Sequence, residues 1–200
     1  MLIACFDLEG VFLPEIWIEV SKITGIEGLS LTTRDIKDYD ELMNHRLGLL
    51  KEHNIGMKEI SEVINKIEPV EGAREFLDWA KSYCQVIILS DTFYEFADSL
   101  MGKLGRPTLF CHNLQIDDGK ISGYKLRIKD PKRKAVQHFH QLNFTTFATG
   151  DSYNDVGMIE EANNACFFRA PDNVLADYPD YKGVNEFDEL KEIISALPVR

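Results

Sequence analysis

Residues 2–10 read LIACFDLEG, an apolar run that ends in two acids and a glycine. The run does not alternate with polar residues, which is the pattern of a strand buried on both faces of a parallel sheet. Runs of the same kind recur at residues 86–89, 108–111, 145–149 and 165–168. Helical patterns lie between most of them, at residues 72–83, 93–104, 132–142, 154–162 and 186–197. Strands that alternate with helices predict an α/β fold with a doubly wound, mostly parallel sheet.

Two stretches interrupt this alternation. Residues 14–68 are helical throughout, and a stretch of about 55 residues is too long for one crossover helix. We therefore predict a small helical cap over residues 14–68, inserted after the first strand of a core made of residues 1–13 and 69–200. In the second stretch, residues 113–128, Asp118-Gly119 lies between two β-like runs and predicts a β-hairpin.

The composition limits the classes of function. The chain has 200 residues, of which 33 are acidic and 22 basic, so its formal net charge is −11. This length suits one good-sized core, or a core with a small attached domain, and the acidity argues against a nucleic-acid partner. No run approaches the roughly 18 apolar residues that span a bilayer. The N-terminus lacks the basic start of a signal peptide, and the four cysteines form no C-x-x-C pair, so we expect a cytoplasmic protein with reduced thiols.

Polar side chains follow three of the predicted strands, where an open α/β sheet binds its ligands. One such cluster is a weak signal, because acid-x-acid pairs are common by chance in so acidic a chain. Three acidic clusters at one sheet edge would repel one another, so we expect a bound cation to offset the repulsion. Carboxylate oxygens are ligands that suit Mg²⁺. The clusters are Asp7 and Glu9, then Ser90 and Asp91, then Asp151, Asn154 and Asp155.

These motifs, in this order, resemble the haloacid dehalogenase-like phosphatase superfamily across nearly the whole chain. The resemblance comprises Asp7-x-Glu9, Ser90, Lys132 at the start of a later helix, and the run from Gly150 to Asp155. Within the superfamily the chain is similar to phosphoserine phosphatases, and more closely to a bacterial branch with added phosphoserine:homoserine phosphotransferase activity. The stretches behind that similarity are DLEG at 7–10, PEIW at 14–17, HRL at 45–47, ILSDTFYEF at 88–96 and GDSYND at 150–155.

The resemblance implies a covalent mechanism that needs Mg²⁺. Asp7 would be the nucleophile that forms an aspartyl-phosphate, and Glu9 the general acid and then the general base. Asp7, the backbone carbonyl of Glu9 and Asp151 would bind Mg²⁺, with Asp155 behind them. Glu9 departs from the superfamily's usual Asp, and its side chain reaches one methylene further.

The remaining implied residues would bind an amino-acid phosphate. Ser90, the Asp91 backbone N–H at a helix start, and Lys132 would hold the phosphate, and Asn154 would donate its amide to the substrate. Glu15 would face the substrate ammonium and Arg46 its carboxylate. The expected substrate is L-phosphoserine, with homoserine as a second phosphoryl acceptor. The oligomeric state is left open.

Several alternatives stay open at this stage. Arg46 taken alone is typical of a solvated helix charge, and Lys134 is a rival to Lys132 for the phosphate. Trp17, Tyr39 and the other aromatic residues are more typical of packing than of a ligand site, and the five histidines form no recognisable site. The substrate could be another small phosphomonoester, such as a nucleotide or sugar phosphate. A receiver-type signalling domain would share the acidic site, but it would carry its phosphorylated Asp at the third strand and lack a cap.

Overall fold

The computed structural model describes residues 1–33, 35–36 and 38–198, and in this part of the chain seven strands form one sheet. Their order is β4-β3-β2-β1-β5-β6-β7, and every neighbouring pair is parallel except β3 and β4. The strands are β1 (Leu2–Phe6), β2 (Gln85–Phe93), β3 (Thr108–Asp117), β4 (Lys120–Lys125), β5 (Thr145–Gly150), β6 (Asn164–Phe168) and β7 (Gly183–Val184).

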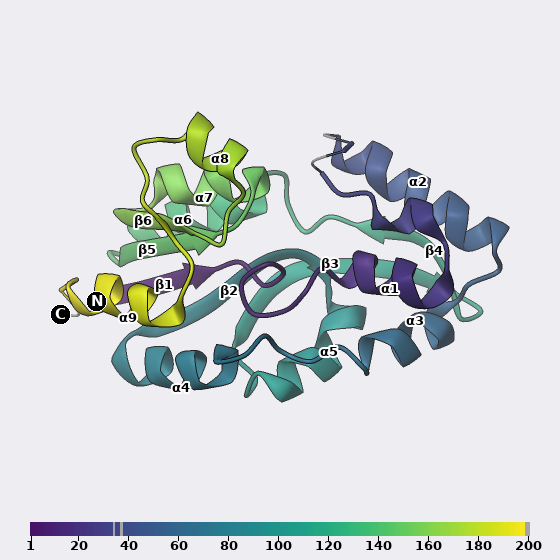
Figure 1. Cartoon of the computed structure of the whole chain (residues 1–200), viewed down its shortest axis with the longest axis horizontal. Coiled ribbons are helices and arrows are strands. Elements are labelled where there is room, and N and C mark those ends of the chain that lie inside the picture. Colours follow the sequence, from purple (N-terminus) through teal and green to yellow (C-terminus); the bar gives the residue numbers. More distant parts are fainter. Residues whose placement is uncertain (34, 37, 199–200) are drawn as a thin grey trace.

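Helices cover both faces of the sheet, as a doubly wound fold requires (Figure 1). All five residues of β1 are buried, and they alternate between two apolar clusters. Leu2, Ala4 and Phe6 belong to the cluster that includes residues of α4 (Ala73–Tyr83), α5 (Tyr94–Lys103) and α9 (Phe187–Ser195). Ile3 and Cys5 belong to the cluster with residues of α6 (Pro131–Gln141), α7 (Val156–Glu161) and α8 (Asp172–Asp177).

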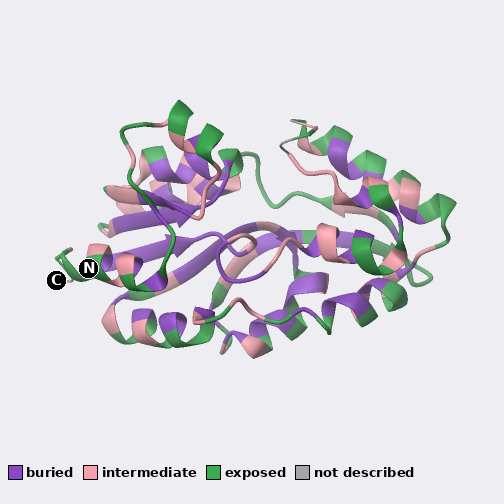
Figure 2. Ribbon diagram, viewed as in Figure 1, coloured by how far each residue is buried: buried purple, intermediate pink, exposed green. Residues whose placement is uncertain are grey.

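The predicted α/β class and mostly parallel sheet are confirmed, and the strand and helix positions largely agree with the sequence patterns. Figure 2 shows the buried strands between helices whose outer faces are exposed. The helix expected at 154–162 is divided into a short 3₁₀ segment, Tyr153–Asp155, and α7. Two strands are longer than expected: β2 extends past Leu89 to Phe93 with a register shift on the way, and β3 extends past Cys111 to Asp117.

The insert after β1 contains α1 (Ile16–Thr24), a 3₁₀ segment (Glu27–Ser30), α2 (Tyr39–Glu52) and α3 (Met57–Ile64). These elements lie together at the end of the molecule away from α6, α7 and α8 (Figure 1). They contact the β3–β4 hairpin: the Met57 N–H donates to the Gly119 carbonyl at 2.8 Å, and the Tyr124 hydroxyl donates to Asp40 at 2.5 Å. The boundaries of this cap at residues 14 and 68 stay a prediction.

The hairpin has the turn that its sequence predicts. Asp118 and Gly119 both have positive φ, 49° and 75°, which is the backbone of a tight turn between antiparallel strands. None of the helices in the described segments is long and apolar enough to cross a membrane.

Candidate active site

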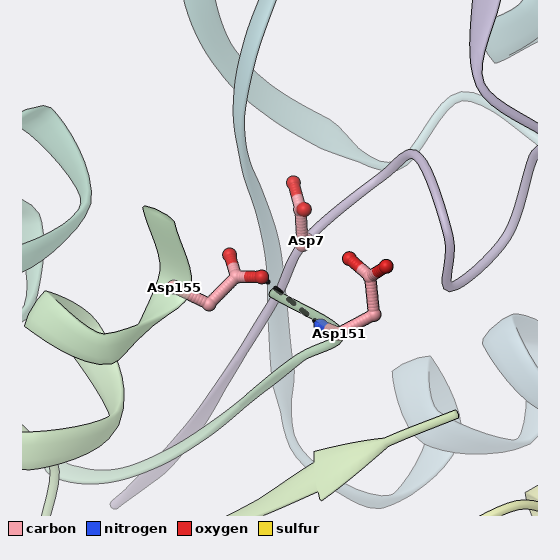
Figure 3. Close-up of side chains that lie close together, drawn as sticks. All are labelled: Asp7, Asp151 and Asp155. Atoms are coloured by element: carbon pink, nitrogen blue, oxygen red, sulfur yellow. Dashed lines mark hydrogen bonds between the residues drawn. The ribbon is translucent and has the colours of Figure 1, made fainter. Parts of the chain in front are cut away.

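Three carboxylates meet at the carboxyl ends of β1 and β5, which are neighbouring strands of the sheet. Asp7 directly follows β1, Asp151 directly follows β5, and Asp155 lies four residues further on. One oxygen from each carboxylate lies within 4.8 Å of the other two, and all three residues are buried. Figure 3 shows the side chains facing a common region. The parallel pairing of β1 with β5 therefore brings together acids that are more than 140 residues apart in the chain.

Two glycines make this close approach possible. Gly10 has φ +78°, and a Cβ at this position would overlap the Asp151 carboxylate. A Cβ at Gly150 would overlap the Asp155 carboxylate. Any side chain at either position would displace one of these carboxylates. The cluster therefore requires glycine at both positions as well as the acids themselves.

A buried lysine balances part of the negative charge. Lys132, at the start of α6, is 3% exposed, and its Nζ lies 2.9 Å from Asp7 Oδ1 and 2.7 Å from Asp155 Oδ1. Burial acts to lower the pKa of Lys132, but Asp155 and Asp7 outweigh burial and raise it well above its usual value. The ammonium is therefore charged at neutral pH. The structure brings Lys132 to the acids and leaves its rival Lys134 outside the cluster.

One lysine does not neutralise three carboxylates. Burial, together with the charges of Asp155 and Asp151, raises the pKa of Asp7 well above its ordinary range. Among the residues that the structure describes, the cluster offers carboxylate oxygens and neither thiolate nor imidazole. Such a donor set suits a hard divalent ion, and Mg²⁺ in particular binds one or two carboxylates and keeps other positions for water and phosphate. The residues present therefore fit Mg²⁺.

Asp155 also fixes the backbone of the loop after β5. Its Oδ2 accepts hydrogen bonds from the backbone N–H groups of Asp151, at 3.0 Å, and Ser152, at 3.1 Å. Its other oxygen faces Lys132. Asp155 thus fixes both the backbone that carries Asp151 and the cation beside Asp7, which accounts for its complete burial.

The Glu9 side chain contacts the first of the inserted helices. Its Oε2 accepts from the backbone N–H of Ile16 at 2.8 Å, at the first turn of α1. Burial and the nearby charge of Glu15 raise the pKa of Glu9 from its ordinary 4.5 to about 8. A carboxyl group with that pKa retains its proton at neutral pH, and this is the protonation state of a general acid.

Arg46 is buried, in contrast to the solvated charge that its surroundings in the sequence would suggest. It is 6% exposed, and its guanidinium lies 4.8 Å from the centre of the Trp17 ring. One terminal nitrogen donates to the Leu31 carbonyl at 2.8 Å. Its Nε is the one buried side-chain polar atom without a hydrogen-bond partner in the segments that the structure describes. Burial lowers the pKa of Arg46 to about 10, so the group is still a cation at neutral pH.

One local expectation is wrong. Asp91 was predicted to lie at a helix start, but β2 extends to Phe93 and α5 begins at Tyr94. Because Asp91 lies in extended backbone, it has no helix N-terminus to offer to a phosphate. Its side chain instead accepts from Asn154 Nδ2 at 3.0 Å. Burial opposes its ionisation, but Lys132, His112 and Asn154 outweigh burial and lower the pKa of Asp91 to about 2.

Asp7, Glu9, Arg46, Asp91 and Asp151 line one cleft between the sheet and the inserted helices, and Lys132 and Asp155 lie behind its lining. A model of the haloacid dehalogenase-like hydrolases matches residues 3–163, which include every predicted site residue. This chain belongs to that family. The cleft of the hydrolase is lined by Asp7, Glu9, Glu15, Trp17, Thr32, Thr33, Tyr39, Leu42, Arg46, Ser90, Asp91, Thr92, Asp151, Ser152 and Asn154.

Relatives of this hydrolase are phosphoserine phosphatases. Phosphoserine phosphatase ThrH of Pseudomonas aeruginosa is 52% identical over 192 residues, which are 96% of this chain and 94% of the relative. Phosphoserine phosphatase of Pseudomonas syringae pv. tomato is also 52% identical, over 95% of this chain and 81% of the relative. A solved phosphoserine phosphatase in apo form has a TM-score of 0.79 over 98% of both chains at 22% identity, which shows the shared fold. Family membership sets aside the receiver-domain alternative.

The structure also reveals site residues that the sequence reading missed. Tyr39 and Trp17 pack as predicted, and both also line the cleft of the hydrolase. His112 was not among the predicted site residues. The structure buries it to 2% exposure and places its Nε2 3.4 Å from Asp91 Oδ1. A signal was present, because His112 directly follows the predicted strand 108–111, just as Asp7 and Ser90 mark the ends of theirs.

Proposed function

We propose that this hydrolase is a Mg²⁺-dependent phosphatase that hydrolyses L-phosphoserine through an aspartyl-phosphate on Asp7. The observation that carries the proposal is the buried Asp7–Lys132–Asp155 cluster at the end of the central strand. It occurs in a chain that shares 52% identity, over nearly its whole length, with relatives named phosphoserine phosphatases.

The first half of the reaction uses Asp7 and Glu9. A carboxylate oxygen of Asp7 attacks phosphorus while the bond from phosphorus to the seryl oxygen breaks. Glu9 gives its proton to that oxygen, so serine leaves as a neutral alcohol. The raised pKa of Glu9 supports this role, because an ordinary glutamate would have lost the proton at neutral pH.

The second half returns both groups to their starting state. Glu9, now ionised, takes a proton from water, and the water oxygen attacks phosphorus. The bond from phosphorus to the Asp7 oxygen breaks, and inorganic phosphate leaves. One group thus serves in both directions, and it is reprotonated by the water that it activates.

Mg²⁺ would be held by Asp7, Asp151 and the Glu9 backbone carbonyl, with Asp155 behind them. When bound, it would neutralise charge on the transferred phosphoryl group and reduce its repulsion from Asp7. Lys132 and Ser90 would hold phosphate oxygens. Lys132 already contacts both Asp7 and Asp155, so its ammonium would stay close to the phosphoryl group after transfer to Asp7.

The opposite wall of the cleft suits the amino-acid part of the substrate. Arg46 would bind the substrate carboxylate, Glu15 its ammonium, and Asn154 would donate its amide. The unpartnered Nε of Arg46 supports this assignment, because a buried donor without an acceptor is costly and a carboxylate would satisfy it. A nucleotide or sugar phosphate would bring no carboxylate to this position.

The direct test is phosphate release from L-phosphoserine by the purified chain with Mg²⁺, beside Asp7→Asn as the inactive control. A panel with phosphoserine, a nucleoside monophosphate and a sugar phosphate, each with wild type and Arg46→Ala, tests the substrate class. We expect Arg46→Ala to reduce kcat/KM for phosphoserine by about ten- to a hundredfold, as for loss of a charged hydrogen bond. An equal loss for substrates without a carboxylate would overturn the amino-acid assignment.

A second acceptor is favoured by the space beside the cleft. A cavity of about 1140 Å³ shares Thr33, Tyr39, Asp91 and Asn154 with the cleft. We propose that homoserine can reach the aspartyl-phosphate from this side, so that its hydroxyl replaces water. Phosphohomoserine should then form when homoserine is added to the reaction with phosphoserine, and its absence would remove this part of the proposal.

The remaining proposals concern the context of the enzyme. We propose that residues 14–68 act as a cap over the core of residues 1–13 and 69–200, and that the protein works in the cytoplasm. The cap is supported by Glu15 and Arg46, which reach the cleft from the inserted segment. The cytoplasm is supported by four buried free cysteines. Fractionation of cells that produce the protein would test the location.

A further inference from the structure

A buried histidine that the proposed reaction does not use lies behind the wall of the cleft. His112 is in β3, opposite Phe93 of β2, and is 2% exposed. Its Nδ1 accepts a hydrogen bond from the backbone N–H of Arg127 at 3.1 Å. An imidazole nitrogen that accepts an N–H carries no proton itself, so the ring proton is on Nε2. Nε2 is therefore the nitrogen of His112 that can donate.

That donor faces the carboxylate of Asp91, with 3.4 Å between Nε2 and Oδ1. The other oxygen of Asp91 accepts from Asn154 Nδ2 at 3.0 Å. The Ser152 hydroxyl donates to the side-chain oxygen of Asn154. A continuous chain of polar contacts thus runs from the Arg127 backbone through His112 and Asp91 to Asn154, with a hydrogen bond at its first and last links and a 3.4 Å contact between His112 and Asp91. Asn154 cannot turn its amide without breaking a bond at each end.

Asp91 is also fixed from the inserted helices. The Tyr39 hydroxyl donates to the Asp91 backbone carbonyl at 2.9 Å, and the Tyr39 ring lies edge-on to the His112 ring, 6.3 Å between centres. Lys132 is a more distant neighbour of Asp91, because its Nζ lies 3.7 Å from Asp91 Oδ2 and is closer to Asp7 and Asp155. His112 and Asn154 therefore lie closer to the Asp91 carboxylate than Lys132 does.

We propose that His112 is a positioning residue: through Asp91 it sets the direction in which Asn154 meets the substrate. The inference rests on the proposed function, in which Asn154 contacts bound phosphoserine. Asn154 would contact the substrate in the ground state and the transition state alike, so its misplacement weakens binding without slowing the chemical step. Loss of the His112 donor is therefore expected to raise KM while kcat changes little.

Two substitutions separate the hydrogen bond at Nδ1 from the polar contact at Nε2. The side-chain oxygen of His112→Asn can replace Nδ1 as acceptor for Arg127, but its amide is too short to reach Asp91. The longer His112→Gln places an amide nitrogen near the position of Nε2 and restores a donor. For phosphoserine with Mg²⁺, we expect His112→Asn to raise KM about tenfold, with kcat within about threefold of wild type. We expect His112→Gln to recover most of the loss.

Equal KM values for the two variants, or a fall in kcat at unchanged KM, would overturn the inference, because a purely structural role does not depend on which nitrogen is replaced. Addition of His112→Asn to Asp91→Asn should raise KM by less than about twofold further, if both act through one chain of bonds. Fully additive effects would also overturn it.

A readout without substrate completes the test. Nitrogen NMR of the wild-type imidazoles should show the ring proton of His112 on Nε2, and a proton on Nδ1 would overturn the proposed arrangement. If wild type releases no phosphate from phosphoserine, the proposed function itself fails. That outcome differs from one in which wild type is active and the two His112 variants are equivalent.

Discussion

Lys132→Met tests the electrostatic core of the site. Methionine has nearly the length of lysine, so the substitution removes the ammonium and preserves most of the packing around α6. In the wild type that ammonium lies 2.9 Å from Asp7 and 2.7 Å from Asp155. Without it, the two buried carboxylates face each other with no cation between them.

The expected loss is large. Two like charges ~4 Å apart at an effective dielectric of ~20 repel by about 4 kcal/mol. Removal of one partner from a buried ion pair costs about 3–5 kcal/mol. We therefore expect the free energy of unfolding to fall by about 3–5 kcal/mol near neutral pH without metal. The deficit should shrink as the pH falls, because the carboxylates of the variant take up protons and their repulsion ends.

Urea unfolding in the presence of a chelator, at about pH 7.5 and about pH 5, measures this difference. Lys134→Met is the matched control, since it removes the same charge from the same helix two residues further along and outside the cluster. The reasoning is refuted if Lys132→Met and Lys134→Met agree within about 1 kcal/mol at neutral pH, or if the deficit grows as the pH falls.

Three further predictions concern the other site residues. The pKa of Glu9 is raised to about 8 by folding, so wild-type stability should fall as the pH rises from about 4.5 through about 8. Glu9→Gln should remove that slope in urea titrations and be more stable by up to about 5 kcal/mol above pH 8, while an unchanged slope would contradict the shift. Gly10→Ala, which would force a Cβ into Asp151, should destabilise the protein by about 1–3 kcal/mol in urea unfolding, whereas Gly102→Ala, in open space, should not; equal effects would count against the steric argument. Mg²⁺ should raise the Tm of wild type by mass action and raise that of Asp151→Asn much less, and equal shifts would mean that the ion binds elsewhere.

Much of the fold and part of the site followed from local sequence patterns. An apolar run that lacks alternation must be buried on both faces, and β1 indeed divides its side chains between two apolar clusters. The rule that ligands bind at the carboxyl ends of parallel strands then selected Asp7, Ser90 and Asp151. Lys132 was separated from Lys134 only by the family motif, since both lie within one basic run and the sequence does not show which one turns inward.

The parts that could not be predicted depend on long-range packing. Arg46 has charged neighbours in sequence, and only the fold of the insert places it against Trp17. Asp91 was expected at a helix start because Leu89 is the last residue of the apolar run. Pairing with β3 extends β2 to Phe93 instead, and the same pairing brings His112 opposite Phe93 and its side chain beside Asp91.

The central claim is that Asp7 carries the phosphoryl group between two displacements. Rapid mixing of the enzyme with Mg²⁺ and radiolabelled phosphoserine, acid quenching, and mass spectrometry of the peptides test it directly. The account predicts one phosphoryl group on the peptide that contains Asp7, formed no later than the first serine is released and absent from Asp7→Asn. Phosphate release with no labelled Asp7 at any time, or sustained turnover by Asp7→Asn, would contradict the account.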